Sequence, residues 1–270
     1  MAAIQELFIY PVKSARGIAQ SSALISRTGL QWDRHWMAID ALGTFISQRT
    51  HPKLAHITPE ITADALVLTA PDLPPLRLPL EPFGDSISVK VWDDCCTGLD
   101  QGEAAAEWVS AAVGDTLRFV RQAPVLDRLA NPQYAGPNRA QVSFVDGFPL
   151  LVCNRASLAD LNARMPAPIP MNRFRPSIVL SGLEPFEEDR IEALQIGAIT
   201  LRLVKPCTRC IITATDQLSG ERSSNPLAVL RKFRFDRTLL GVAFGENAVI
   251  GAGFGRTLTR GAECVTVMSA

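Results

Sequence analysis

Short apolar runs, separated by joints rich in glycine and proline, make up most of the first 95 positions. Runs of this length with β-branched and aromatic residues are typical of strands. The proline-rich segment 70–82 argues against helix there, because proline removes a backbone donor and clashes with the preceding turn. Two runs on either side of the glycine-containing loop 41–43 predict a hairpin. The predicted strands of this part cover residues 4–10, 21–27, 36–40, 44–49, 65–71, 76–80 and 86–92.

Three segments carry helical signals instead. Ser157 and Asp160 have the spacing of a capping box, and a proline-rich run follows that segment and ends it. Asn225 suits an N-cap, and Pro226 suits the first helical position after it. The predicted helices cover residues 103–114 and 157–165 and a segment that starts at 225.

The second half of the chain again contains mainly strand-like runs, at residues 176–182, 198–204, 210–216, 239–245, 247–253 and 263–268. Many strands with few helices, not in strict alternation, favour a mixed α+β, predominantly β architecture with barrel-like sheets over a doubly wound sheet. The loop-rich segment 131–141 lies at the end of a plausible boundary region, 115–140. We therefore predict two domains, 1–115 and 116–270.

Composition and charge limit the partners and the location. Lys+Arg and Asp+Glu both number 27 in this 270-residue chain, so the overall basic character of a nucleic-acid-binding protein is absent. No run approaches the roughly 18 apolar residues of a membrane helix. The first residues lack the basic start and long apolar core of a signal peptide. We expect a cytoplasmic protein with neither a nucleic-acid nor a membrane partner.

The glycine-rich segment 251–255 suggests a dinucleotide-binding loop, but its spacing is G-x-G-x-G rather than G-x-G-x-x-G. Only fifteen residues follow Gly255, too few for the strand–helix–strand unit of roughly 30 residues that the loop requires. We interpret the segment as a turn or bulge.

The pair Cys207 and Cys210 is the most informative motif. A redox pair gains from a helix N-terminus, whereas the β-branched run after Cys210 predicts the start of a strand. A structural zinc needs four ligands, and no second C-x-x-C pair is present. Plain buried thiols are a further alternative. Because Lys205 and Arg209 flank the pair and favour thiolate, one thiolate could complete a thiophilic metal centre whose other sulfurs come from an ene-dithiolate pterin.

The phosphate of such a pterin needs cationic partners. Lys13 and Ser14 lie in the loop after the first predicted strand, and Arg34 lies at the head of another. Arg173 and Arg175 precede a strand in the second half. Lysine, arginine and hydroxyl donors on loops are what phosphate binding requires, although each residue taken alone is expected to be a solvated surface group.

Several segments resemble a known family. The stretches Y-P-V-K-S, G-L-Q-W-D-R-H-W-M-A-I-D and F-I-S-Q-R are similar to the N-terminal β-barrel that precedes MOSC domains. The ordered elements N-R-F-R-P, C-T-R-C and I-I-T-A-T-D resemble the MOSC domain itself, which is named after the C-terminus of molybdenum-cofactor sulfurase. The resemblance covers nearly the whole chain and implies an N-terminal β-barrel-like domain followed by a MOSC β-barrel domain with a few helices.

The resemblance implies that the molybdenum cofactor, Mo-molybdopterin, is bound. It assigns Cys210 as the metal ligand and catalytic residue, with Cys207 as its neighbour, and no role falls to Asp146. The implied cofactor-binding residues are Lys13, Ser14, Arg34, Gly147, Phe148, Asn172, Arg173, Arg175, Thr208 and Arg209. The other four thiols are expected to be buried, as is usual for cysteine: Cys95, Cys96, Cys153 and Cys264.

Relatives of this kind include the mitochondrial amidoxime-reducing component and bacterial reductases of N-hydroxylated bases. The resemblance therefore implies an oxidoreductase that cleaves the N–O bond of small N-hydroxylated substrates. Neither a C-x₄-C-x₂-C ferredoxin run nor the N-terminal anchor of the mitochondrial members is recognisable, so the electrons are expected from a separate ferredoxin- or cytochrome b5-type protein. The alternative is a non-catalytic carrier of sulfur or of the cofactor. An adaptor without cofactor is disfavoured, because Lys13, Arg34, Arg175 and Cys210 occur together.

Overall fold

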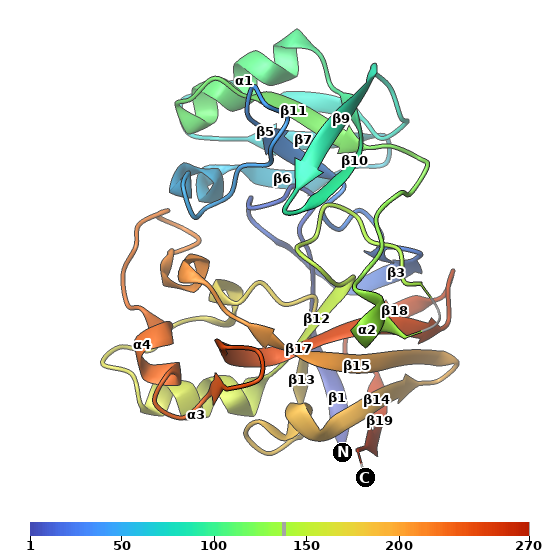
Figure 1. The fold of residues 1–270 in the computed structure, drawn as a ribbon, viewed down its shortest axis with the longest axis vertical. Helices are drawn as coiled ribbons and strands as arrows, with labels where there is room; N and C mark the ends of the chain where they lie inside the picture. Colours follow the sequence, from blue (N-terminus) through green and yellow to red (C-terminus); the bar gives the residue numbers. More distant parts are fainter. Residues whose placement is uncertain (137–138, 270) are drawn as a thin grey trace.

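Strands dominate the computed structural model, which describes residues 1–136 and 139–269 (Figure 1). The predominantly β fold agrees with the prediction. Residues 137 and 138 of the predicted loop-rich segment lie outside the described residues. Two bodies of sheet lie one above the other in Figure 1, and the two chain ends lie close together on the lower one.

Seven strands of the lower body close into a barrel, since the last strand of the ring pairs back to the first. The ring runs in the order β12 (Leu150–Asn154), β13 (Ile178–Ser181), β1 (Ala2–Ile9), β19 (Glu263–Met268), β14 (Ile191–Ile196), β15 (Ile199–Thr208) and β17 (Gly241–Ala252). All neighbours are antiparallel except β12 and β13. The N-terminal strand β1 thus completes a barrel whose other strands all come from beyond residue 149.

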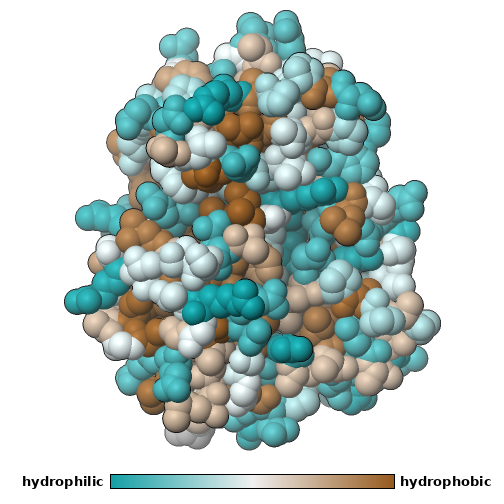
Figure 2. All heavy atoms as spheres, turned by 180° about the vertical axis from the view of Figure 1, so that it is seen from behind, coloured by the Kyte–Doolittle hydropathy of each residue, from teal (hydrophilic) through white to brown (hydrophobic). Residues whose placement is uncertain are grey.

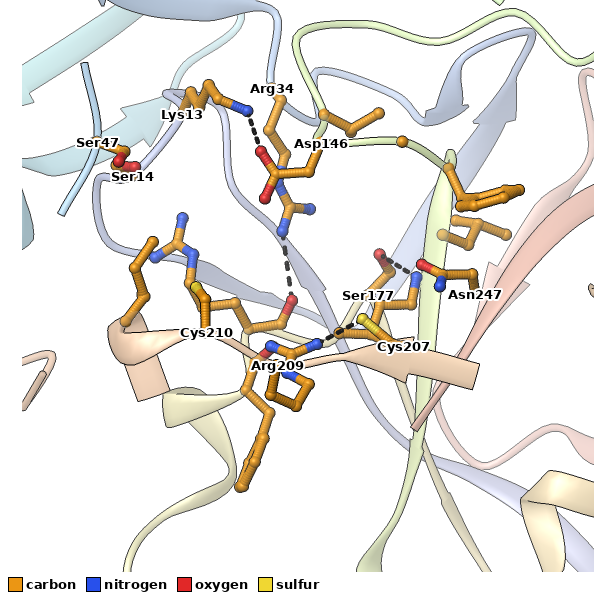
Figure 3. A pocket seen from close by; sticks show the side chains of 18 of the residues that line it. Lys13, Ser14, Arg34, Ser47, Asp146, Ser177, Cys207, Arg209, Cys210 and Asn247 are labelled. Atoms are coloured by element: carbon orange, nitrogen blue, oxygen red, sulfur yellow. Dashed lines mark hydrogen bonds and ion pairs between the residues drawn. The ribbon is translucent and has the colours of Figure 1, made fainter. Parts of the chain in front are cut away.

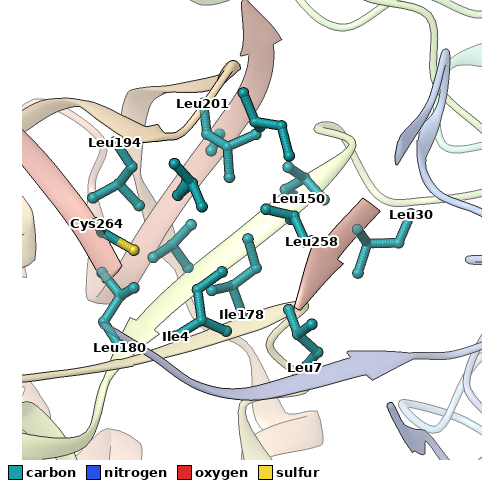
Figure 4. Close-up of a cluster of buried hydrophobic side chains, with 14 of the residues drawn as sticks. Ile4, Leu7, Leu30, Leu150, Ile178, Leu180, Leu194, Leu201, Leu258 and Cys264 are labelled. Carbon is teal, nitrogen blue, oxygen red and sulfur yellow. The ribbon is translucent and has the colours of Figure 1, made fainter. Parts of the chain in front are cut away.

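Apolar side chains from all seven strands fill the barrel (Figure 4). Ile4 and Leu7 of β1 meet Leu180 of β13, Leu194 of β14 and Leu201 of β15 there. Burial of each such side chain contributes about 1.5–3 kcal/mol. The interior is therefore a packed core, and a ligand site must lie at the rim of the barrel or outside it.

The upper body combines two sheets with one helix. Helix α1 (Glu103–Val113) contributes Trp108 to a core that it shares with Trp36, Leu66 and Phe119. One sheet has the order β5 (Trp36–Ile39), β11 (Arg118–Gln122), β10 (Asp94–Asp100) and β9 (Ser86–Val91). The other consists of β6 (Thr58–Ile61), β7 (Ala65–Thr69) and β8 (Leu76–Pro79).

Smaller elements surround the two bodies. The strands are β2 (Ile18–Gln20), β3 (Ser22–Ser26), β4 (Gly29–Leu30), β16 (Phe235–Asp236) and β18 (Thr257–Thr259). The helices are α2 (Pro132–Ala135), α3 (Arg155–Ala163) and α4 (Pro226–Leu230), and 3-10 turns are η1 (Pro52–His56), η2 (Met171–Arg173), η3 (Glu187–Arg190) and η4 (Ile211–Ala214). Among the described helices, none has the length and apolar character needed to cross a bilayer. On the face opposite to that of Figure 1, apolar side chains form separate small areas among hydrophilic ones (Figure 2).

The helix predictions are correct in place but not in every cap. Helix α1 ends at Gly114, whose left-handed backbone (φ +85°) suits glycine, and Asn225 caps α4 as predicted. The predicted capping box at Ser157 is wrong, because α3 begins earlier and Asn154 caps it. Ser157 is buried instead and donates a hydrogen bond to Glu188 (2.7 Å).

Two strand predictions need correction. Residues 239–245 and 247–253 form one strand, β17, with a bend at Gly245 (φ +76°), where a Cβ atom would lie 2.7 Å from the Val152 carbonyl oxygen. The hairpin at 36–49 is present but short: Asp40 N–H donates to the Thr44 carbonyl oxygen (2.9 Å) and Ile46 N–H to the Ala38 carbonyl oxygen (3.0 Å). Ile39 and Phe45 form an isolated bridge there, so 44–49 is not a full strand, and the other edge of β5 pairs with β11. The segment 251–255 is the end of β17 and a turn, as predicted, with Gly253 at φ +99°.

Candidate functional site

A pocket lies between the rim of the barrel and the loops of the upper body (Figure 3). It collects residues from both ends of the chain and from its middle. Eight of the eleven predicted site residues line it: Lys13, Ser14, Arg34, Gly147, Phe148, Arg175, Arg209 and Cys210. The structure therefore brings together groups that are up to 197 positions apart in the sequence, 13 and 210 being the extremes.

Three of these residues, Ser14, Arg34 and Arg175, have a left-handed backbone, with φ of +67°, +53° and +55°. Such a conformation costs a residue other than glycine about 1–3 kcal/mol and tends to occur at functional sites. The strain directs three polar side chains from separate loops into the same pocket.

Arg34 and Arg175 flank a shared aromatic ring. Their guanidinium carbons lie 4.2 Å and 4.3 Å from the centre of the Tyr10 ring. Arg34 forms an ion pair with Asp33, a fully buried carboxylate that also accepts the backbone N–H of Tyr10 (2.7 Å). Asp33 therefore holds both the ring and one of the two cations in place.

Arg175 has an incomplete set of partners. Its Nη1 donates to the Ala15 carbonyl oxygen (2.6 Å) and to Gln217 Oε1 (3.2 Å). Its Nη2 is buried and has no hydrogen-bond partner within residues 1–136 and 139–269. Burial, reinforced by the charge of Arg34, lowers the pKa of Arg175 to about 10. A half-buried cation whose buried donor lacks a partner among the described residues, next to a second cation, favours binding of an anionic ligand.

Lys13 is held by a separate group of residues. Its Nζ donates to Asp146 Oδ1 (2.6 Å) and to the Phe144 carbonyl oxygen (2.8 Å), and Trp92 Nε1 donates to the same Asp146 oxygen (3.1 Å). Burial lowers the pKa of Lys13, whereas Asp146 opposes that shift. Burial works against the charged form of Asp146 as well, but the Lys13 ammonium holds the pKa of this carboxyl below its usual range. Asp146, to which the sequence assigned no role, is thus the counter-ion of a predicted site residue.

The two thiols of the C-x-x-C pair have different surroundings. Arg209 Nη1 donates to Cys207 Sγ (2.7 Å), and Arg209 Nη2 donates to the Phe174 carbonyl oxygen (2.6 Å). Burial raises the pKa of Cys207, although Arg209 opposes this shift. Figure 3 shows the Cys207 and Cys210 sulfurs on different sides of the Arg209 guanidinium. Both thiols are half-buried and free.

The prediction that the pair starts a strand is wrong. Strand β15 ends at Thr208, and Cys210 is the residue before the 3-10 turn η4. The Cys210 carbonyl oxygen accepts from the N–H and the hydroxyl of Thr213 (3.1 Å and 2.9 Å), so hydrogen bonds within the turn fix the β-branched run there. The thiol of Cys210 is consequently presented from a rigid corner at the end of a barrel strand.

Three predicted site residues do not line the pocket: Asn172, Arg173 and Thr208. Arg173 is buried and donates to the Ala214 carbonyl oxygen (2.8 Å) and to Asp216 (3.0 Å), which ties it to the turn that follows Cys210. The side chain of Thr208 is exposed. Among the other cysteines, Cys95 is also exposed, contrary to the prediction, whereas Cys96, Cys153 and Cys264 are buried.

Asp146 is not the only residue of the pocket wall that we did not predict from the sequence. Arg49 and Ser47 line the pocket, and the Arg49 guanidinium stacks 4.4 Å from the centre of the Trp92 ring. Both lie in the stretch F-I-S-Q-R, which carried the family resemblance, so that motif held a signal for them. Ser177 and Asn247, by contrast, belong to no motif that we recognised.

The composition of the wall indicates which kind of ligand fits. It contains five cations (Lys13, Arg34, Arg49, Arg175 and Arg209) and one acid, Asp146. No group of three or more histidine, cysteine, aspartate or glutamate side chains that could hold a metal ion occurs in the described part of the chain. A bare metal ion therefore lacks ligands here, whereas an anionic organic group that brings its own metal donors and needs one protein thiolate fits the residues present.

Comparison with known proteins gives two family matches. Residues 1–116 match the MOSC N-terminal beta barrel domain, and residues 139–261 match the MOSC domain. Mitochondrial amidoxime-reducing component 1 of Mus musculus is 32% identical over 261 residues, covering 93% of this chain and 77% of that protein. The Homo sapiens protein of the same name is 33% identical over 263 residues (92% and 78%). Molybdenum cofactor sulfurase of Bos taurus is 27% identical over 260 residues, covering 88% of this chain and 30% of that protein.

Proposed function

Since this chain belongs to the family of MOSC-domain proteins that includes the mitochondrial amidoxime-reducing components, we propose that it is a reductase of small N-hydroxylated compounds that uses the molybdenum cofactor. The observation that carries the proposal is the meeting of two free thiols, of which Cys207 accepts a hydrogen bond from Arg209, with five cations and a single acid in one pocket. When bound, the cofactor would supply the two-electron reduction of the N–O bond, which releases the oxygen as water.

The residues of this chain would have separate roles in binding the metal, binding the anionic part of the cofactor and positioning these groups. Cys210 offers the thiolate for the metal, and Lys13, Arg34 and Arg175 attract and orient the anionic part of the cofactor. Asp146 keeps the Lys13 ammonium charged and turned into the pocket. Arg173 acts as a positioning residue, because it holds the turn that follows Cys210.

The partners and the location are part of the proposal. We infer that the electrons come from a separate ferredoxin- or cytochrome b5-type protein. The amidoxime-reducing relatives are named as mitochondrial, so the predicted cytoplasmic location stays a prediction. The match to a molybdenum cofactor sulfurase supports the second candidate, a carrier of sulfur or of the cofactor without reductase activity.

The proposal is tested on protein purified from a host that makes the cofactor. We expect about one molybdenum per chain, as a single thiolate site implies, and turnover of an amidoxime with an artificial electron donor. The Cys210→Ser variant should lose both the metal and the turnover. The matched control, Cys207→Ser, should keep both, because Cys207 is bound to Arg209 rather than offered to a ligand.

Elemental analysis shows whether the protein holds molybdenum, and turnover rates show whether it is a reductase. Wild-type protein that holds molybdenum but never turns over an amidoxime would favour the carrier. Metal-free wild-type protein without reductase activity, or a Cys210→Ser variant as active as the wild type, would contradict the proposal.

A further inference from the structure

A second cavity of about 270 Å³ lies between the end of β11, the turn around Pro82, the loop that carries Trp32 and His35, and the turn from β3 to β4 at 26–28. It shares no lining residue with the pocket of Cys210. Neither the proposed reductase function nor the core of the upper body explains the polar groups on its wall.

The first of these groups is Arg121 of β11. Only 5% of this residue is exposed, and its guanidinium carbon stacks 5.1 Å from the centre of the Trp36 ring and 5.8 Å from that of Trp32. Its Nη1 is buried and has no hydrogen-bond partner among the residues described. Burial lowers the pKa of Arg121, and the charge of Glu81, an exposed residue, only partly opposes that shift. A buried guanidinium without a bound acid is costly unless an anion completes it.

Two further groups on the same wall lack partners. His35 Nε2 and Gln122 Oε1 are buried, and neither has a hydrogen-bond partner within the described ranges. Burial and the charge of Arg121 lower the pKa of His35 to about 4, so its imidazole is neutral at neutral pH. Each buried polar group left without a partner destabilises the folded protein, because its desolvation is not compensated. Three such groups on one cavity wall indicate a site built for a polar ligand.

The other lining residues indicate which apolar group the ligand carries besides its polar group. The Trp32 ring, Pro82, Pro124 and Leu126 line the cavity and offer apolar surface. No aspartate or glutamate lines it, while the exposed Arg27 adds a second cation. The fork of a guanidinium binds a carboxylate or a phosphate. The apolar surface beside it suits an anion that carries a ring or a branched alkyl group, which a small carboxylic acid offers and inorganic phosphate lacks.

We propose that this cavity is a binding site for a small carboxylic acid with an aromatic or branched apolar body, with the carboxylate on Arg121 and the body against Trp32. The site is independent of the cofactor pocket and does not require the reductase activity.

The four tryptophans allow a site-resolved test. Their indole N–H groups give four signals in a ¹⁵N–¹H spectrum, which Trp→Phe variants assign. Trp32 lines the proposed site, Trp92 donates to Asp146 at the cofactor pocket, and Trp108 lies on α1. Titration with benzoate should shift the Trp32 signal in a saturable way and leave Trp108 unchanged, whereas the neutral analogue benzamide and inorganic phosphate should have no such effect.

Variants then identify the residue that binds the carboxylate. Arg121→Met keeps the apolar stem of the side chain and should weaken benzoate binding about tenfold or more, since a charge-assisted hydrogen bond is lost. Arg77→Met removes the same charge from an exposed pair with Asp64 and should bind like the wild type. Glu81→Gln removes an acid that acts on Arg121 and should tighten binding, which provides a second readout if Arg121→Met does not fold.

Three results would overturn the inference. The first is a Trp32 signal that stays unchanged at saturating benzoate, in which case solvent satisfies the guanidinium. The second is a shift of Trp92 alone, which would place benzoate in the cofactor pocket. The third is an Arg121→Met variant, or phosphate on the wild type, that gives the same Trp32 titration as benzoate on the wild type.

Discussion

Single residues of the pocket that contains Cys210 have strained backbone conformations. Ser14, Arg34 and Arg175 all have positive φ, a region that residues with a Cβ avoid. The surrounding contacts maintain this strain: the Ser14 carbonyl oxygen accepts from Gln48 Nε2 (2.7 Å), and Gln48 in turn pairs with Gln217. The loops are therefore held in position before any ligand arrives.

A pair of variants at Ser14 measures this strain. Ser14→Gly and Ser14→Ala both remove the hydroxyl, but only glycine adopts φ +67° without steric cost. We expect Ser14→Gly to exceed Ser14→Ala by about 1 kcal/mol in the free energy of unfolding. Urea denaturation of the cofactor-free proteins gives this difference. Equal stability of the two variants would mean that the loop relaxes at no cost.

Among the elements, strand β17 both closes the barrel and buries an acidic side chain. It bends at Gly245 so that it can pair with both β12 and β15 and close the barrel. The next residue, Glu246, is only 4% exposed, and its Oε1 has no hydrogen-bond partner in the described chain. Burial, and then the nearby Asp189 and Glu188, raise the pKa of Glu246 to about 9. Its carboxyl is therefore neutral in the folded protein at neutral pH.

This neutral acid makes stability depend on pH. The unfolded chain releases the Glu246 proton near pH 4.5 and the folded chain near pH 9, so the folded state binds more protons between these values and loses stability as pH rises. The Glu246→Gln variant lacks this titration. From pH 5 to pH 8.5 the wild type should lose stability relative to Glu246→Gln, by at most about 1.4 kcal/mol per pH unit.

Denaturant titrations at several pH values measure the effect. Glu192→Gln is the matched control, because Glu192 lies exposed on β14. It should show the same pH dependence as the wild type. Parallel curves for the wild type and Glu246→Gln would contradict a neutral Glu246.

At the scale of the whole molecule, the loop that follows strand β1 links the barrel to the upper body. Strand β1 pairs with β13 and β19 of the barrel, and the chain then continues into the loop that carries Lys13 and Ser14. Contacts between the bodies add to this link, for example Arg16 on the Leu218 carbonyl oxygen (2.6 Å) and Arg222 on the Arg49 carbonyl oxygen (2.5 Å). The pocket lies where these segments meet, so its walls depend on both bodies.

The two predicted segments can be produced separately to test this dependence. Segment 116–270 lacks β1, which leaves a gap between β13 and β19 and exposes the apolar barrel interior. We expect it to aggregate or to unfold without cooperativity, and co-expression with segment 1–115 to restore a folded complex. Circular dichroism and gel filtration report the outcome. A monomeric 116–270 fragment that unfolds cooperatively would show that β1 is dispensable.

Much of this architecture could be predicted from local signals. The family matches confirm the predicted N-terminal β-barrel and MOSC domains. The predicted end of α1 near Gly114 and the predicted cap at Asn225 are correct, because a helix end depends on a few neighbouring residues. The cap of α3 was wrongly predicted at Ser157, because the prediction used local spacing alone. The Ser157 hydroxyl instead binds Glu188, which lies 31 positions away. Asp146 and Arg49 were missed because their partners, Lys13 and Trp92, lie 133 and 43 positions away.

The sequence by itself determined many of the strands, both ends of α1, the start of α4 and the motif that contains Cys210, since periodicity, capping and spacing act over a few residues. It did not predict the strands β6, β10, β11, β12 and β14. Only the tertiary structure decided that β1 closes the barrel, that Arg209 donates to Cys207, and that Arg175 Nη2 and Arg121 Nη1 are buried without a partner among the described residues. These features arise from contacts between segments far apart in the chain. Burial then changes the charge preference of each group, because a charge removed from water needs a partner that no local pattern specifies.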